Sequence, residues 1–225
     1  MSEDEWLGAT DPAPMLEFLR GKVSERKLRL FAVACCRRQP AQWEEDPREK
    51  LAVEVAEQFC DGLADRRTLD QAQEQVEGHL ELYPGEPVYS AGFWACSEDI
   101  VHDAESAAGF AANSVARSKV EFSSPGFDDE FEAARKVELS GQSDLLRDIF
   151  GNPFCAVAFD PSWRTEAVIA LARGLYETRD FSAAPVLADA LEDAGCEDAA
   201  VLGHLRGGGP HVRGCWCVDG VLDRT

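Results

Sequence analysis

The stretch "DPSWRTEAVIALARGLYETRDFSAAPVLADALEDAG", residues 160–195, decides the fold class. It holds two segments in which apolar residues recur every three or four positions, the spacing of one helix face. The apolar positions are Val168, Leu171, Ala172 and Leu175 in the first segment, and Val186, Leu187, Ala190 and Leu191 in the second. Gly195 closes the second segment, as glycine commonly does after a helix. The stretch therefore predicts two consecutive helices that pack together as a hairpin.

The same helical pattern extends through most of the chain. Three helix starts share one signal, because Asp11-Pro12, Asp46-Pro47 and Asp160-Pro161 each place a carboxylate at the N-cap and a proline in the first turn. The strand-like exception is "CAVAF" at 155–159, which we interpret as an extended connector. We predict an all-α fold of packed helix hairpins, with at most this one strand-like connector and room for solenoid-like stacking.

Proline and glycine mark the internal break of the chain. "YPGEP" at 83–87 cannot continue a helix. We expect an N-terminal helical part at 1–82, alanine-rich middle helices at 83–140 and a C-terminal helical part at 141–225, all sharing one continuous core.

The charge of the chain bears on its partners. There are 42 acidic and 22 basic residues, a net charge of -20, which disfavours direct binding to nucleic acids and to anionic membrane surfaces. A basic protein partner is permitted. The start "MSEDEWLG" lacks the features of a secretory signal, and no apolar run approaches the roughly 18 residues of a membrane span. We expect a cytoplasmic protein whose eight cysteines are free thiols.

One basic cluster stands out against this acidic background. It comprises Lys27, Arg29, Arg37 and Arg38. An anion site is one interpretation, but the surrounding charge favours pairing with acidic residues of the same chain.

The C-terminal stretch "GGGPHVRGCWC", residues 207–217, is the candidate site. Pro210 fits the first position of a terminal helix, and three glycines before it fit a tight connector that needs positive φ. On that helix His211 and Cys215 would be four residues apart, on one face.

Three segments carry a resemblance to a known family: "LLRDIFGNPF" (145–154), "LADALEDAGC" (187–196) and "GPHVRGCW" (209–216). Together with "DPAPMLEFLRGK" (11–22) and "RKLRLFAVACCRR" (26–38), they resemble a much-duplicated family of helical proteins in planctomycete bacteria. The resemblance implies a bacterial cytosolic helical protein and brings no activity with it.

Members of that family often carry Cys-x7-His-x6-His-x3-Cys near the end, which the resemblance places at Cys196, His204, His211 and Cys215. Two cysteines and two histidines are suitable ligands for tetrahedral zinc. Helix geometry makes Cys196 the difficult fourth ligand. A single helix from 196 to 204 would separate its ends by about 12 Å, whereas two ligands of one zinc lie within roughly 4.5 Å. Cys196 can join only if it lies outside the helix and folds back.

Two other interpretations of the stretch stay open. "GCW" resembles the sequence around the nucleophile of papain-like proteases, in which case His204 or His211 would act as the base for Cys215. Alternatively, Cys215 and Trp216 are core residues of the last helix and the glycines only connect.

The leading functional interpretation is an interaction or adaptor module, without identifiable catalytic residues, whose acidic helical surface binds another protein. The alternatives are a zinc-stabilised helical module that uses the C-terminal Cys/His residues, and a cysteine-dependent enzyme.

Overall fold

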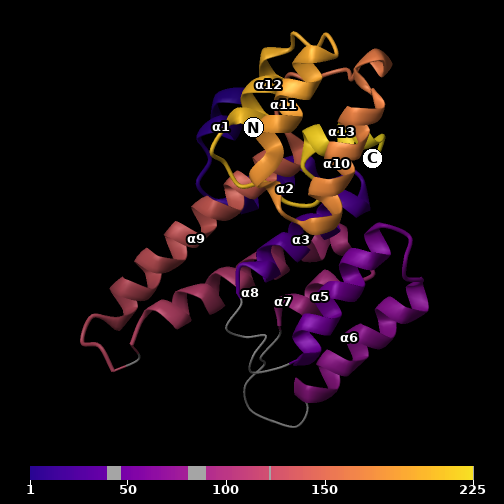
Figure 1. Ribbon diagram of the computed structural model, residues 1–225. Helices are drawn as coiled ribbons and strands as arrows, with labels where there is room; N and C mark the ends of the chain where they lie inside the picture. The colour runs from indigo at the N-terminus through magenta and orange to yellow at the C-terminus, as the bar shows by residue number, and fades with distance from the viewer. Residues whose placement is uncertain (40–46, 81–89, 122, 225) are drawn as a thin grey trace. The chain divides into compact units, whose positions relative to one another are not determined.

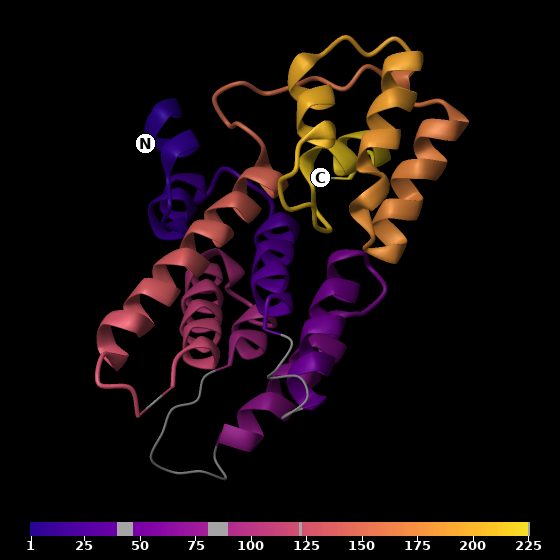
Figure 2. The same cartoon turned by 60° about the vertical axis from the view of Figure 1, so that its left-hand side comes forward.

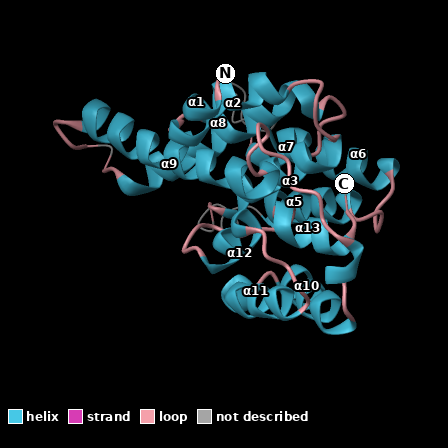
Figure 3. Cartoon of the chain, turned by 90° about the horizontal axis from the view of Figure 1, so that it is seen from above, coloured by secondary structure: helices cyan, strands magenta, loops and turns pink. Residues whose placement is uncertain are grey.

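The computed structural model describes residues 1–39, 47–80, 90–121 and 123–224. Within these ranges the chain forms helices joined by loops, and no strand (Figure 3). The predicted all-α class is confirmed. The "CAVAF" segment at 155–159 is a non-helical connector without strand pairing.

The chain divides into two compact units, Met1–Ser143 and Asp144–Thr225. The division falls within one long helix, α9 (Phe127–Phe150). The proposed three parts at 1–82, 83–140 and 141–225 stay a prediction.

The first unit is organised around α3, which packs against α5, α7 and α8 (Figures 1 and 2). Its helices are α1 (Glu3–Gly8), α2 (Pro12–Leu19), α3 (Glu25–Arg37), α5 (Pro47–Cys60), α6 (Arg66–Leu80), α7 (Ala91–Ala95), α8 (Ile100–Lys119) and the first part of α9. Alanines at 104, 107, 108, 111, 112 and 116 are buried along α8. Because alanine side chains are small, the neighbouring helices can approach α8 closely.

Three arginines of the basic cluster, all in or next to α3, make polar contacts within this unit. Arg29 is buried and donates two hydrogen bonds from Nη1, to the carbonyl oxygens of Ala95 (2.7 Å) and Ser97 (2.9 Å) at the end of α7. Arg37 pairs with the buried Glu57 at 2.8 Å, and Arg38 pairs with the buried Glu138 of α9. Arg37 and Arg38 thus pair with acidic residues of the same chain, as expected from its acidity, whereas Arg29 bonds to backbone carbonyl groups.

Two of the predicted aspartate-proline helix starts can be compared with the structure. Asp11 accepts a hydrogen bond from the N–H of Ala13 and caps α2. Asp160 also acts as a cap, but of a short 3-10 helix at Pro161–Trp163, and α10 begins later, after Thr165. Asp46 lies outside the described residues.

The second unit has its own apolar core. Its helices are the end of α9, α10 (Glu166–Thr178), α11 (Ala184–Asp193), α12 (Ala199–Arg206) and α13 (Trp216–Leu222), with short 3-10 helices at Pro161–Trp163 and Phe181–Ala183. α11 packs against both α10 and α12, and α10 packs against α13. The predicted hairpin of 160–195 is thus the α10–α11 pair, although Val186 is exposed rather than buried.

The terminal helix begins later in the chain than predicted. Pro210 does not start it, because α13 begins at Trp216 with Cys215 as its N-cap residue. Residues 211–215 form a turn in which Gly214 has a φ of +95°, a left-handed conformation that an α-helix cannot contain. The glycines at 207–209 do connect α12 to this turn, but none of them has positive φ.

All eight cysteines lie in the described part of the chain, and all are free thiols, as expected. No helix among the described residues is both long enough and apolar enough to cross a membrane.

The 155–159 connector packs on α13. We therefore expect alanine substitutions at two helical glycines to have different effects on the free energy of unfolding. A Cβ added at Gly220 would overlap the ring of Phe159, which is held between Trp163 and Trp216. We expect Gly220→Ala to lower the free energy of unfolding by about 1–3 kcal/mol. Urea unfolding would measure the change.

Gly174→Ala in α10 is the matched control, because an added Cβ there meets no atom within 4 Å. It should raise the free energy of unfolding by about 0.5–1 kcal/mol. Equal effects of the two substitutions would contradict the packing of Phe159 on Gly220.

Candidate metal centre

Asp148, near the end of α9, is the buried centre of the site. Its side chain is 1% exposed. Its Oδ1 lies 3.0 Å from Nε2 of His204 and 2.9 Å from Nδ1 of His211. Its Oδ2 accepts a hydrogen bond of 2.9 Å from the backbone N–H of Val212. One carboxylate therefore contacts α12 and the turn that precedes α13.

His204 reaches this carboxylate from the last turn of α12. Asp198 caps the start of that helix by accepting from the N–H groups of Ala200 and Val201. Val201 and Leu205 are buried on one face of α12 and fix its rotation about its axis. Nε2 of His204 also lies 3.2 Å from Sγ of Cys215.

The turn at 211–215 brings His211 and Cys215 together without the predicted helix. The N–H of Cys215 donates to the carbonyl of Val212 at 3.0 Å, which closes the turn. Nδ1 of His211 then lies 3.9 Å from Sγ of Cys215. Nε2 of His211 is buried and has no hydrogen-bond partner among the described residues, so only Nδ1 is engaged.

Four side chains thus converge on one point. They are Asp148, His204, His211 and Cys215, which we call the donor cluster. One potential ligand atom of each lies within 4.8 Å of the other three. Ligands at 2.0–2.3 Å from a tetrahedral zinc would be about 3.3–3.8 Å apart. Four of the six distances between the donor atoms are 2.9–3.9 Å, within a few tenths of an ångström of that range, and all six are within 4.8 Å.

Three of the four residues expected from the sequence are therefore together, and Cys196 is not with them. Cys196 is buried in the apolar core of the second unit, outside the donor cluster. Its N–H donates to the carbonyl of Leu191 at 2.9 Å, after Gly195 turns the chain with a φ of +90°. Cys196 does lie outside the helices, between α11 and α12, but it is buried in the core and does not join the other ligands.

Asp148 takes the fourth place and was missed by sequence reasoning. A signal for it exists in "LLRDIF", residues 145–150. Helical spacing places Asp148 on the same face as Leu145 and Ile149, both of which are buried. An acid among apolar residues on one helix face needs a buried partner, and two histidines of the second unit provide it.

The cluster alters the ionisation of its members in the metal-free protein. Burial alone would raise the pKa of Asp148, but hydrogen bonds from His204 and His211 outweigh it, and the pKa is lowered. The pKa of Cys215 is raised well above its usual value, first by burial and then by the negative charge of Asp148. Without a metal ion, the site therefore holds a carboxylate and a neutral thiol.

A pocket of about 380 Å³ lies against the donor cluster. It is lined by Asp144, Arg147, Asp148, Gly203, His204, Gly207, Gly208, Gly209, Pro210 and His211, and we call it the glycine pocket. Arg147 pairs with Asp144 at 2.7 Å on its wall. Cys215 is absent from the lining.

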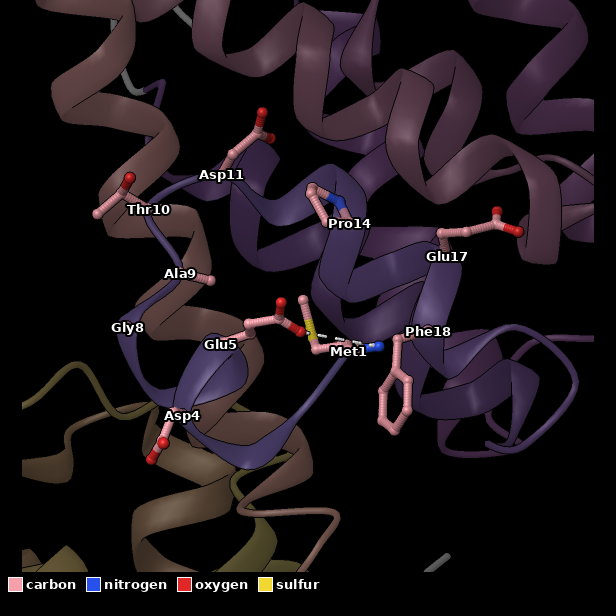
Figure 4. A pocket seen from close by; sticks show the side chains of 10 residues that line it. All are labelled: Met1, Asp4, Glu5, Gly8, Ala9, Thr10, Asp11, Pro14, Glu17 and Phe18. Atoms are coloured by element: carbon pink, nitrogen blue, oxygen red, sulfur yellow. Dashed lines mark ion pairs between the residues drawn. The ribbon is translucent and has the colours of Figure 1, made fainter.

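A larger hollow, of about 720 Å³, lies in the first unit along α1 and α2. The carboxylates of Asp4, Asp11 and Glu17 point away from one another there, while Glu5 faces the amino group of Met1 (Figure 4). Glu5 also accepts a hydrogen bond from the N–H of Ser2 and so completes a helix cap. The hollow is lined by neither histidine nor cysteine, and its carboxylates form no cluster.

No protein-family model matches the chain, and no curated protein or solved structure matches it either. The function is therefore inferred from the residues of the second unit.

Because the carboxylate of Asp148 is buried, we expect its replacement by alanine to destabilise the protein far more than the same replacement at Asp144, one turn earlier in α9. Asp148→Ala removes the acceptor of two imidazoles and of the Val212 N–H. We expect it to lower the free energy of unfolding of chelator-treated protein by about 3 kcal/mol. Urea unfolding would measure this change.

Asp144→Ala, one turn earlier, is the control. Asp144 is half-exposed and forms a surface ion pair with Arg147, so its loss should cost about 0–1 kcal/mol. Equal losses for the two variants would mean that the Asp148 network contributes no special stability.

Proposed function

We propose that the second unit is a zinc-binding module in which the donor cluster holds one ion. The observation that carries the proposal is that each histidine directs a single ring nitrogen toward both the carboxylate and the thiol. His204 uses Nε2 for both contacts, and His211 uses Nδ1 for both. Four lone-pair donors that face one point are the arrangement a metal ion requires.

The same observation weighs against a cysteine-dependent enzyme. In a nucleophile–histidine–acid arrangement, one ring nitrogen faces the nucleophile and the other faces the acid. Here one nitrogen faces both, and the other nitrogen of His211 has no partner among the described residues. Cys215 is also fully buried, and its pKa is raised rather than lowered. A reactive thiol needs exposure and a depressed pKa.

A metal ion would also engage the four donor atoms of the cluster better than shared protons do. To donate to Asp148, each imidazole nitrogen must carry a proton, and that N–H then faces the sulfur of a neutral thiol as well. A divalent ion replaces these protons and deprotonates the thiol, so all four donors bind one charge.

The donor types favour zinc among divalent ions. Imidazole and thiolate are the ligands that zinc prefers, and a carboxylate is a common addition. Magnesium and calcium take oxygen ligands instead. The carboxylate of Asp148 and the thiolate of Cys215 would together balance the two positive charges of the ion.

The ion would stabilise the second unit by joining three segments. Asp148 lies at the end of α9, His204 at the end of α12, and the other two ligands in the turn before α13. Because the unfolded chain does not present these donors together, metal binding free energy adds to folding free energy.

Metal analysis tests the proposal. Protein purified without a nickel column should contain one zinc per chain, and chelator should lower its melting temperature. His211→Ala and Cys215→Ala should lose the zinc, because each removes one donor of four.

Cys196→Ala is the control, since Cys196 lies outside the donor cluster. This variant should keep its zinc even though a buried side chain is shortened. Metal-free protein whose melting temperature does not change with chelator would refute the proposal. Zinc lost in Cys196→Ala but kept in Asp148→Asn would refute this ligand set.

A second candidate is the interaction module with an acidic surface. It is supported by the net charge of -20, while Arg29, Arg37 and Arg38 make contacts within the first unit. Arg37 and Arg38 each neutralise one acidic residue of the same unit, so these pairs leave the net negative charge that a partner would meet unchanged.

The interaction hypothesis predicts a salt-sensitive, basic partner. A protein captured at about 50 mM salt should be basic and should dissociate near 500 mM, because the Debye length falls as salt rises. Quantitative mass spectrometry of the captured proteins at both salt concentrations would measure this. Capture only of acidic proteins, or capture that salt leaves unchanged, would contradict it.

A further inference from the structure

The donor cluster is reached by solvent from one side. Three of its members line the glycine pocket, namely Asp148, His204 and His211. The side chain of His204 is 21% exposed, that of His211 is 8% exposed and that of Asp148 is 1% exposed. Cys215 is fully buried and lies outside the lining. A ligand that enters from the pocket would therefore meet the carboxylate and the imidazoles of the cluster, and not its sulfur.

The walls of the pocket are kept open by residues without side chains. Gly203, Gly207, Gly208 and Gly209 are four of its lining residues. A Cβ added at Gly203, Gly208 or Gly209 would meet no atom within 4 Å. The volume of about 380 Å³ is near the lower end of ligand sites in proteins. It suits a small molecule and is too small for a polymer.

The charges around the pocket allow an anion of low charge to enter. Zinc bound by one carboxylate and one thiolate has no net charge, so the centre does not repel an incoming anionic donor. Arg147 adds a guanidinium to the wall, and its partner Asp144 is half-exposed at the rim. A carboxylate matches this set, because one oxygen can bind the ion and guanidinium groups pair well with carboxylates.

We infer that the metal centre is open toward the glycine pocket, and that a small carboxylate enters there and binds the ion as an additional ligand. This inference rests on the proposed zinc site and deepens it, since a purely structural site would be closed by its four protein ligands. Zinc can expand from four to five ligands, which gives the incoming oxygen a place.

Cobalt(II) substitution tests the inference, because cobalt reports its coordination number in its visible absorption. Acetate, with azide as a second probe, is titrated into the cobalt-loaded full chain. We expect the intense absorption of four-coordinate cobalt to weaken and saturate as the fifth ligand binds.

Blocking variants show whether the ligand enters through the pocket. Gly203→Leu fills the pocket from α12 without backbone strain, and Gly208→Leu fills it from the connector. Each should weaken acetate binding by about tenfold, the effect of roughly 1.4 kcal/mol, and leave the cobalt content unchanged. Gly174→Leu, on an open face of α10, is the matched control and should bind acetate as the unmodified chain does.

The outcomes separate the inference from the proposed function. If cobalt binds and its spectrum does not respond to acetate or azide, the site is closed and the inference is overturned while the zinc proposal stands. The inference also fails if both blocking variants fold, bind cobalt and respond to acetate as Gly174→Leu does. If no cobalt or zinc binds, the proposed function fails and the inference fails with it.

Discussion

The buried carboxylate of Asp148 is the constraint on which the second unit depends. An ionised carboxylate removed from water is costly unless hydrogen bonds or charges compensate it. Here two imidazoles and the Val212 N–H surround it. If a metal ion binds at Oδ1, the bond from Val212 to Oδ2 still orients the carboxylate, as outer contacts of metal ligands generally do. The end of α9, the end of α12 and the terminal turn must all meet at this group.

Local backbone geometry makes that meeting possible. α9 stops at Gly151, whose φ is +66°, three residues after Asp148, and an added Cβ there would lie 3.2 Å from the ring of Trp216. This close approach brings Trp216, and with it the preceding Cys215, beside the end of α9. Gly214, at positive φ, then turns His211 and Cys215 toward the same carboxylate. These two glycines shape the site more than the 207–209 run does.

Much of the fold follows from sequence, because helix periodicity and capping are local. The α10–α11 pair, the Asp11 cap and the buried alanines of α8 all come from patterns within one segment. The site is predictable only in part. His204, His211 and Cys215 are close in sequence, whereas Asp148 is 56 residues from His204. Helical spacing can mark Asp148 as a buried acid, but it does not identify the distant residues that contact it. The terminal helix was placed too early, because Pro210 fits a helix start and Gly214 fits a helix interior as well as a turn. The family resemblance places Cys196 among the ligands, and only the folded chain shows that it belongs to the apolar core.

X-ray absorption at the zinc edge of the purified protein tests the central claim most directly. The donor cluster predicts one sulfur at about 2.3 Å and three or four nitrogen or oxygen ligands at about 2.0–2.2 Å. A second sulfur in the coordination shell would contradict it, because that would require Cys196 or another cysteine to replace Asp148 or a histidine. Protein that retains no zinc when it is reconstituted with one equivalent would contradict it as well.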